Sequence, residues 1–339
     1  MATTYAIPDG RVAMAATLYT GNGSTLSVSN AVNGVSMQPD LVWVKGRSVA
    51  YSHGLYDSVR GATKRLISNL TNAEDTLSGV TAFNSGGFSL GSDINFNENA
   101  ATYVGWQWKG GGTPVSNTAG SITSSVSANT TAGFSVVTYT GVGGTATVGH
   151  GLGVAPQMII VMPRSFASDK YVYLASIGAG NYMSINLTNA SASTTLWNST
   201  SPTSTVFTVN GNGANQNTST FVAYCFAPVA GYSAFGSYTG NGSADGPFVF
   251  TNFRPRYVLI KSSSDAVNWY VYDTSRDTGN LAGNQLYPNL SNAEVSSVGI
   301  DILSNGFKVR YNASPLNASG STYIYACFAE NAFKFSNAR

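Results

Sequence analysis

The residues that could take part in chemistry are few and widely separated along this 339-residue chain. Neither of the two histidines, His53 and His150, has a second histidine or a Cys-x-x-Cys pair at the spacing of metal ligands. The two cysteines, Cys225 and Cys327, occupy equivalent places in two similar strands, where a free thiol is more often a small buried side chain than a nucleophile. We therefore predict no catalytic residue, no metal site and no disulfide.

The glycine-rich segment at 148–153, Val-Gly-His-Gly-Leu-Gly, is only loosely similar to a phosphate-binding loop. A P-loop needs a following Gly-Lys-Ser/Thr, and a dinucleotide-binding loop needs a helix after it. Here a β-strand pattern follows, so we interpret the segment as a turn. No cofactor is expected.

Acidic residues are the remaining candidates for chemistry. An Asp-x-x-Arg pattern occurs at 57–60 and again at 273–276, and we interpret both as turn-stabilising ion pairs, because a third, similar segment has Leu174 in place of the acid. Glycoside hydrolysis needs two carboxylates about 5–10 Å apart, and spacing alone places no pair across a groove. The acidic residues that crowd the last third of the chain are Asp273, Asp277, Glu294 and Asp301.

The composition favours β-structure with a polar but weakly charged surface. Charged residues make up only 9% of the chain, against a usual value of about 25%, although 43% of the residues are hydrophobic. Solubility must therefore rest on Ser, Thr, Asn and Gly. The 37 glycines and the 12% of aromatic residues are typical of β-rich proteins with many tight turns.

Charge and hydropathy argue against two classes of partner. The basic residues are scattered and the formal net charge is only +2, so the chain lacks the positive stripe that phosphate neutralisation requires. No apolar run approaches the ~20 residues of a membrane-spanning helix, and the first residues lack the features of a signal peptide. We expect no nucleic-acid partner and no membrane insertion.

Internal repetition sets the expected architecture, because three copies of one unit share landmarks in the same order. The middle copy is the most diverged. The landmarks are Tyr-Thr-Gly (19–21, 139–141, 238–240), a proline with an apolar run (39–45, 156–161, 255–261), Asn-Leu-Thr/Ser-Asn-Ala (69–73, 186–190, 289–293) and an alternating strand (102–108, 220–227, 322–329).

Connections rich in Gly, Pro and Ser place the domain boundaries. We predict domains at 1–112, with a short N-terminal leader, at 113–229 and at 230–339. Units of about 100 residues are too long for a solenoid, whose repeats have about 20–50 residues. The expected fold is all-β, with three tandem antiparallel β-sandwich domains of jelly-roll-like topology.

Three aromatic residues outside the clear core strands are candidates for ligand binding or for an interface: Tyr51, Trp197 and Trp269. Their side chains combine an apolar ring with a polar group, which suits stacking on sugars as well as protein contacts. Ordinary packing is the alternative interpretation for each of them.

The third copy carries the most specific motifs. Residues 234–249 read Ala-Phe-Gly-Ser-Tyr-Thr-Gly-Asn-Gly-Ser-Ala-Asp-Gly-Pro-Phe-Val, and 253–261 read Phe-Arg-Pro-Arg-Tyr-Val-Leu-Ile-Lys. The chain ends at 328–339 on Phe-Ala-Glu-Asn-Ala-Phe-Lys-Phe-Ser-Asn-Ala-Arg. These segments resemble a family of phage and prophage tail-fibre and virion structural proteins with tandem β-domains, which more often has proline at the position of Ala332. The first copy is similar at 39–45 and 53–57, whereas the second departs from the pattern.

The resemblance implies a non-enzymatic structural protein of a bacteriophage virion, assembled in the cytoplasm of the host bacterium. A tail fibre or appendage involved in host attachment is the first expectation. A capsid-surface decoration or head-fibre protein and a polysaccharide-cleaving fibre enzyme are the alternatives. The expected partners are other virion proteins, further copies of the chain, with a trimer as the first choice, and a polysaccharide or protein of the host surface.

Overall fold

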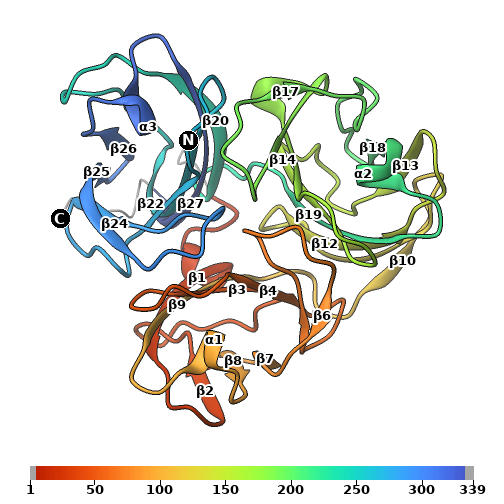
Figure 1. Ribbon diagram of the computed structural model, residues 1–339, viewed down its shortest axis with the longest axis horizontal. Helices are drawn as coiled ribbons and strands as arrows, with labels where there is room; N and C mark the ends of the chain where they lie inside the picture. The colour runs from red at the N-terminus through yellow and green to blue at the C-terminus, as the bar shows by residue number, and fades with distance from the viewer. Residues whose placement is uncertain (1–4, 333–339) are drawn as a thin grey trace.

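Residues 5–332 are described by the computed structural model of the chain, and nearly all of its regular structure is antiparallel β-sheet. Residues 1–4 of the leader and residues 333–339 of the family-type ending lie outside the described residues. Figure 1 shows three lobes in a triangular arrangement, and each lobe corresponds to one sequence repeat. The prediction of an all-β chain is confirmed.

Repeat one forms an inner sheet in the order β1-β9-β3-β4, an outer sheet in the order β2-β8-β7 and the small pair β5-β6. Its elements are η1 (Gly10–Val12), β1 (Met14–Thr20), β2 (Leu26–Ser29), β3 (Leu41–Gly46), β4 (Gly54–Asp57), β5 (Lys64–Arg65), β6 (Asp75–Thr76), β7 (Val80–Asn84), β8 (Gly87–Leu90), α1 (Ile94–Asn97) and β9 (Thr102–Trp108).

Repeat two extends its inner sheet to eight strands in the order β10-β11-β12-β19-β14-β15-β16-β17, and its outer sheet is the pair β13-β18. Its elements are β10 (Val115–Asn117), β11 (Ser124–Asn129), β12 (Phe134–Thr140), β13 (Ala146–Gly149), β14 (Met158–Pro163), β15 (Tyr171–Leu174), η2 (Ala175–Ile177), β16 (Asn181–Ser184), β17 (Ala192–Ser193), β18 (Val206–Val209), α2 (Gly211–Asn215) and β19 (Thr220–Phe226).

Repeat three has two four-stranded sheets, an inner one in the order β20-β27-β22-β23 and an outer one in the order β21-β26-β25-β24. Its elements are β20 (Ser233–Thr239), β21 (Phe248–Phe250), β22 (Phe253–Ser262), β23 (Tyr270–Asp273), β24 (Leu281–Gln285), β25 (Val295–Leu303), β26 (Gly306–Val309), α3 (Ser314–Asn317) and β27 (Thr322–Ala332).

The inner sheets have a common topology. In each repeat the last strand (β9, β19 or β27) pairs on one side with the Tyr-Thr-Gly strand and on the other side with the apolar strand that follows the proline. The expected boundaries at 112/113 and 229/230 fall in the connections between β9 and β10 and between β19 and β20. These strand orders do not confirm a jelly roll, since β24, β25 and β26 pair as a simple meander.

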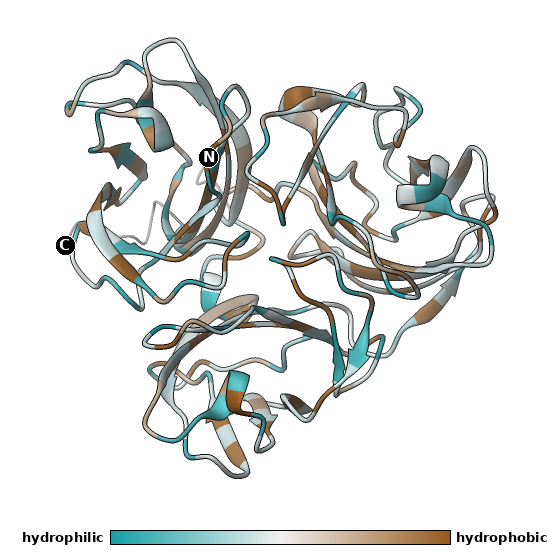
Figure 2. Ribbon diagram, in the orientation of Figure 1, coloured by the Kyte–Doolittle hydropathy of each residue, from teal (hydrophilic) through white to brown (hydrophobic). Residues whose placement is uncertain are grey.

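The central strands of each inner sheet are buried on both faces, which explains the almost continuous apolar runs in the sequence. Along β9, Val104, Trp106 and Trp108 face the centre of the molecule, whereas Tyr103 packs in the separate core of repeat one. Figure 2 shows hydrophobic residues along the strands and many hydrophilic ones in the short helices and peripheral loops.

The centre of the molecule is a hydrophobic cluster shared by all three repeats. Its middle is a triangle of Trp108, Phe226 and Phe328, which hold equivalent positions in the last strand of each repeat. Their ring centroids lie 6.1 Å (Trp108 to Phe226), 5.6 Å (Trp108 to Phe328) and 5.5 Å (Phe226 to Phe328) apart, at tilted or edge-on angles. Such geometry is favourable for aromatic pairs beyond the area that they bury.

The start of repeat one packs against the end of repeat three. The turn η1 contacts β27, and Gly10 lies so close to that strand that an added Cβ would be 1.9 Å from the carbonyl oxygen of Ala329. Further along, the hydroxyl of Ser275 donates to the carbonyl oxygen of Ala16 in β1 at 2.7 Å. The three repeats therefore form a closed ring instead of an open string.

Because the repeats share one core, we expect them to unfold together. Phe226→Ala should lower the free energy of unfolding by about 3–5 kcal/mol and increase amide hydrogen exchange in the inner strands of all three repeats. Phe207→Ala, in the separate core of repeat two, is the matched control for a cavity away from the centre. If exchange after Phe226→Ala rose only within 113–229, the shared-core interpretation would be wrong.

Two buried lysines stand at equivalent positions of β3 and β22, where repeat two has Met162. The ammonium group of Lys45 donates to the carbonyl oxygens of Gly46 at 2.9 Å and Val49 at 3.4 Å. Burial lowers the pKa of Lys45 to about 7, and that of Lys261 to about 8.

A lowered lysine pKa makes the folded state more stable as the pH rises. Between the folded pKa of about 7 for Lys45 and an unfolded value of about 10.4, the unfolded chain binds more protons, so the free energy of unfolding increases with pH. Lys45→Met, which copies repeat two, should reduce the increase measured by urea unfolding at pH 7 and pH 10. Replacing the exposed Lys109 by Met should leave this increase in the free energy of unfolding unchanged. The same increase in both variants would contradict the prediction.

Candidate functional site

The Asp-x-x-Arg segment of repeat one lies at the contact with repeat two. Within it, Arg60 pairs with Asp57, and the hydroxyl of Tyr224, from β19 of repeat two, donates to the Oδ2 atom of Asp57 at 2.9 Å. The same guanidinium donates to Glu74 at 2.9 Å, and Arg164 of repeat two binds both oxygens of Glu74 at 2.8 and 3.0 Å. The expected ion pair exists within repeat one, and Tyr224 and Arg164 connect it and its neighbour Glu74 to repeat two.

The contact between repeats three and one has the same construction. Here Arg276 pairs with Asp273, and the indole nitrogen of Trp106 donates to the Oδ2 atom of Asp273 at 2.9 Å. Both Arg276 and Arg47 of repeat one donate to Glu294, each at 3.0 Å to its Oε2 atom. Each of the two carboxylates is therefore held by a side chain of the neighbouring repeat.

The contact between repeats two and three lacks the charges at every equivalent position. The Asp-Arg pair is replaced by Leu174 and Ile177, and the aromatic donor by the buried Ala326. In place of the Glu-Arg bridge, the amide and the hydroxyl of Ser191 both donate to the carbonyl oxygen of Ser263, at 2.9 and 3.0 Å. This backbone bond recurs in the other two contacts, where the amides of Glu74 and Glu294 are the donors.

Electrostatics keep the paired carboxylates ionised. Burial alone would raise the pKa of Asp273, but the charge of Arg276 and the hydrogen bonds from Arg276 and Trp106 hold it below its usual value. The pKa of Glu294 is also lowered, because hydrogen bonds and charge from Arg47 and Arg276 outweigh its burial. Carboxylates stabilised as anions in this way are poor general acids.

The other two of the four acidic candidates in repeat three, Asp277 and Asp301, are also engaged. The carboxylate of Asp277 accepts hydrogen bonds from the side-chain and backbone nitrogens of Asn284, and Asp301 pairs with Arg310 at 3.4 Å. These contacts give no support to a catalytic pair of carboxylates.

Three unlike residues at equivalent positions form a second set of bonds between repeats. The Nε2 atom of His53 lies 2.9 Å from the carbonyl oxygen of Tyr287 in repeat three, and its Nδ1 atom accepts from Trp43. The ammonium of Lys170 donates to the carbonyl oxygen of Asn72 in repeat one at 2.8 Å, and the indole nitrogen of Trp269 donates to Ser184 in repeat two at 3.0 Å. Of the three, the sequence singled out only Trp269 as an interface candidate, and it did not reveal the set because the three side chains differ in chemistry.

The remaining reactive groups are part of the packing. Both cysteines are free and buried, and burial raises the pKa of each thiol, so the nucleophilic thiolate is disfavoured. Buried His150 accepts from the amide of Leu152 in its own turn, and its Nε2 atom bonds the carbonyl oxygen of Thr203 elsewhere in repeat two. Among residues 5–332 there is no cluster of three or more potential metal-ligating side chains, and no helix there is long and apolar enough to cross a membrane.

The three aromatic candidates have different surroundings. Tyr51 is partly exposed outside the strands, and its hydrogen bond to Glu98 raises its pKa. Trp197 is only 2% exposed, and its indole nitrogen donates to the carbonyl oxygen of Asn181 in the same repeat. Trp269 is fully buried at the contact between repeats two and three. Neither tryptophan can therefore stack on a ligand at the surface.

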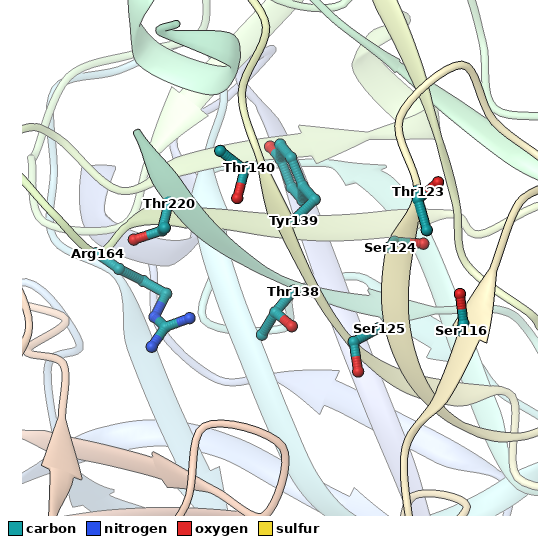
Figure 3. A pocket seen from close by; sticks show the side chains of 9 residues that line it. All are labelled: Ser116, Thr123, Ser124, Ser125, Thr138, Tyr139, Thr140, Arg164 and Thr220. Carbon is teal, nitrogen blue, oxygen red and sulfur yellow. The ribbon is translucent and has the colours of Figure 1, made fainter. Parts of the chain in front are cut away.

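One surface hollow of repeat two is lined mostly by hydroxyl groups. It has a volume of about 320 Å³, and Figure 3 shows the guanidinium of Arg164 on the side of Thr220 and Thr138, with Ser125 and Ser116 farther along the hollow. The salt bridge to Glu74 occupies that guanidinium. Apart from Tyr139, whose hydroxyl donates to the carbonyl oxygen of Ala214, the other lining residues are serines and threonines, so this hollow offers hydrogen bonds and no acid-base catalyst.

Two further hollows have aromatic walls and lie at equivalent places in repeats two and three. The first is bounded by β15, β16 and α2, and the second by β23, the end of β24 and α3. Their tyrosines escaped sequence reasoning because they stand in or beside strands, where an apolar pattern predicts core. The recurrence of a tyrosine at 171 and 270 was the signal that could have identified them.

The differences among the three contacts predict how each ion pair can be replaced. Asp57→Leu alone leaves the buried guanidinium of Arg60 without its nearest carboxylate, and should lower the free energy of unfolding by about 3–5 kcal/mol. Adding Arg60→Ile copies repeat two, and the double variant should be about 2 kcal/mol more stable than the single one, since apolar residues often substitute for a buried pair at little cost.

Chemical denaturation of the two variants and the unaltered chain measures this difference. Asp301→Leu, which removes the more exposed pair with Arg310, is the control and should cost less than about 1 kcal/mol. A double variant as unstable as Asp57→Leu would show that the charges cannot be exchanged for apolar side chains at this contact.

Comparison with known proteins gives a family for the whole ring. A family model described as a domain of unknown function (DUF7483) matches residues 12–332, a range that includes all three repeats. No curated protein matches the sequence. The chain therefore belongs to the DUF7483 family.

Proposed function

We propose that the protein is a non-enzymatic structural protein of a bacteriophage virion, a tail fibre or appendage that takes part in host attachment. The observation that carries the proposal is the closure of three β-rich repeats around one core, with ion pairs buried between them. Such a body keeps its shape through packing, which suits a component of a particle that must survive outside the cell. The resemblance of the motifs at 234–249 and 253–261 supports the phage setting.

The non-enzymatic part of the proposal rests on the state of the reactive side chains. Buried Asp57 and Asp273 are neutralised by arginines, and the two thiols are enclosed in cores. The proposal keeps three β-sandwich units of jelly-roll-like character, with boundaries near 112/113 and 229/230.

The proposed partners follow from this role. They are other virion proteins, further copies of the chain in a symmetric oligomer, with a trimer as the first choice, and a polysaccharide or protein of the host surface. Assembly would take place in the cytoplasm of the host bacterium, and the finished protein would reside in the virion.

Electron microscopy of particles labelled with an antibody to this chain tests the proposal. We expect label on the tail of particles from a phage or induced prophage that encodes it. Particles from a deletion mutant are the control and should remain unlabelled. Label over the head would contradict a tail appendage and favour a capsid decoration or head-fibre protein. Purified particles without label would contradict a virion role.

A further inference from the structure

The two aromatic hollows, called here the tyrosine clefts, have matching positions in the fold. Tyr171 of β15 pairs with Val161 of β14, and Tyr270 of β23 pairs with Ile260 at the corresponding position of β22. The clefts have volumes of about 630 Å³ in repeat two and about 170 Å³ in repeat three. A hollow that recurs at the same place in two diverged repeats is a property of the fold, and its walls show what it can bind.

Paired aromatic rings form one wall of each cleft. In repeat three the rings of Tyr270 and Tyr287 are 5.2 Å apart and nearly perpendicular, and Tyr311 lines the same cleft. In repeat two the rings of Tyr171 and Tyr182 are 5.8 Å apart and tilted by 50°. Each cleft therefore offers a ring surface on which a flat, partly apolar ligand can lie.

The rest of each cleft is polar without being charged. Gln285 and Ser297 line the cleft of repeat three, and Ser193, Thr194 and Asn212 line that of repeat two. None of the residues lining either cleft is Asp, Glu, Lys or Arg. Anionic and cationic ligands find no counter-charge here, whereas hydroxyl groups find both donors and acceptors.

Several tyrosine hydroxyls in the clefts are free to bond a ligand. Within the part of the chain that the structure describes, the hydroxyls of Tyr182, Tyr270 and Tyr311 have no hydrogen-bond partner. By contrast, the hydroxyl of Tyr238, in the core of repeat three, donates to the carbonyl oxygen of Leu316. Free donors beside an aromatic surface are what a ligand with many hydroxyl groups requires.

Repeat one fills the equivalent space with its own side chains. Gly54 stands where the other repeats have Tyr171 and Tyr270, and a Cβ added there would lie 2.5 Å from the ring of Phe96. The guanidinium of Arg65 then covers that ring, 5.9 Å from its centroid. The chain therefore contains its own example of this place in the fold with no tyrosine at the equivalent position and with a charged group over the ring that fills the space.

We propose that the tyrosine clefts of repeats two and three bind neutral saccharides. The apolar C–H face of a pyranose ring stacks on a tyrosine, and its hydroxyls bond the amide, hydroxyl and phenol groups around it. The inference deepens the proposed function by naming the class of host-surface ligand, and its biological role rests on that function. A short peptide is a poorer match, because neither cleft offers a charged group for its termini.

Saturation-transfer NMR on the full chain tests the proposal directly. The probes are glucose, galactose, mannose and N-acetylglucosamine at millimolar concentration, with irradiation of the aromatic protons of the protein. Because stacking needs only the C–H face of a pyranose, we expect transfer to ring protons of at least one of the four sugars. No transfer to any of them would overturn the proposal.

Substitutions then assign the signal to the clefts. Removing both pairs, by Tyr270→Ala with Tyr287→Ala and Tyr171→Ala with Tyr182→Ala, should reduce the transfer at least tenfold. Since Tyr270 is only 7% exposed, its removal also affects packing, so a second variant blocks the clefts from outside. Arginine in place of the exposed Ser193 and Ser297 should reduce the transfer equally without opening the core.

The control is Phe250→Ala, which removes an exposed aromatic ring outside the clefts. It should leave the transfer unchanged. Loss of signal in Phe250→Ala, or its survival in the blocked variant, would place sugar binding elsewhere and overturn the proposal. Labelling of particles remains informative in every case, because a virion protein without sugar binding would still be found on the particle.

Discussion

The contact among Trp108, Phe226 and Phe328 at the centre of the ring is the constraint on which the rest of the structure depends. Each of these side chains comes from the last strand of its repeat. In the inner sheet that strand lies between the Tyr-Thr-Gly strand and the apolar strand that follows the proline. One face of the sheet is covered by the repeat's own core and the other only by the neighbouring repeats. A single repeat would expose that second face to water, so burial of apolar area couples the three.

Polar contacts around this centre give each repeat its place. The same backbone bond, from the residue after Asn-Leu-Thr/Ser-Asn-Ala to the neighbouring repeat, occurs at all three contacts. The side chains around it differ as complete sets: two contacts combine aspartate, arginine, glutamate and an aromatic donor, and the third has none of these at the equivalent positions. A buried charge without its partner is costly, whereas an apolar replacement of the whole set is tolerated. This explains why Leu174, Ile177 and Ala326 occur together.

The ring leaves binding to positions outside the shared core. Inner strands are buried on both faces, so a ligand can reach only the outer loops, the short helices and the edge strands. The tyrosine clefts lie in this outer region, beside α2 and α3. Repeat one shows how little is needed to lose the site, since Gly54 allows Phe96 to move into the space. Fold and binding are thus separable, because they depend on different faces of the same repeat.

The sequence by itself determined the β-rich class, the three copies and the strands that begin and end them, because period-two patterns and turn residues act locally. It also determined that Cys225 and Cys327 are buried. Only the tertiary structure decided that Asp57 and Asp273 serve the contact between repeats, that Trp269 is hidden between two of them, and that Tyr171 and Tyr270 line clefts. These facts depend on which segments pack against which face, and contacts between residues that are far apart along the chain leave no local pattern in one sequence.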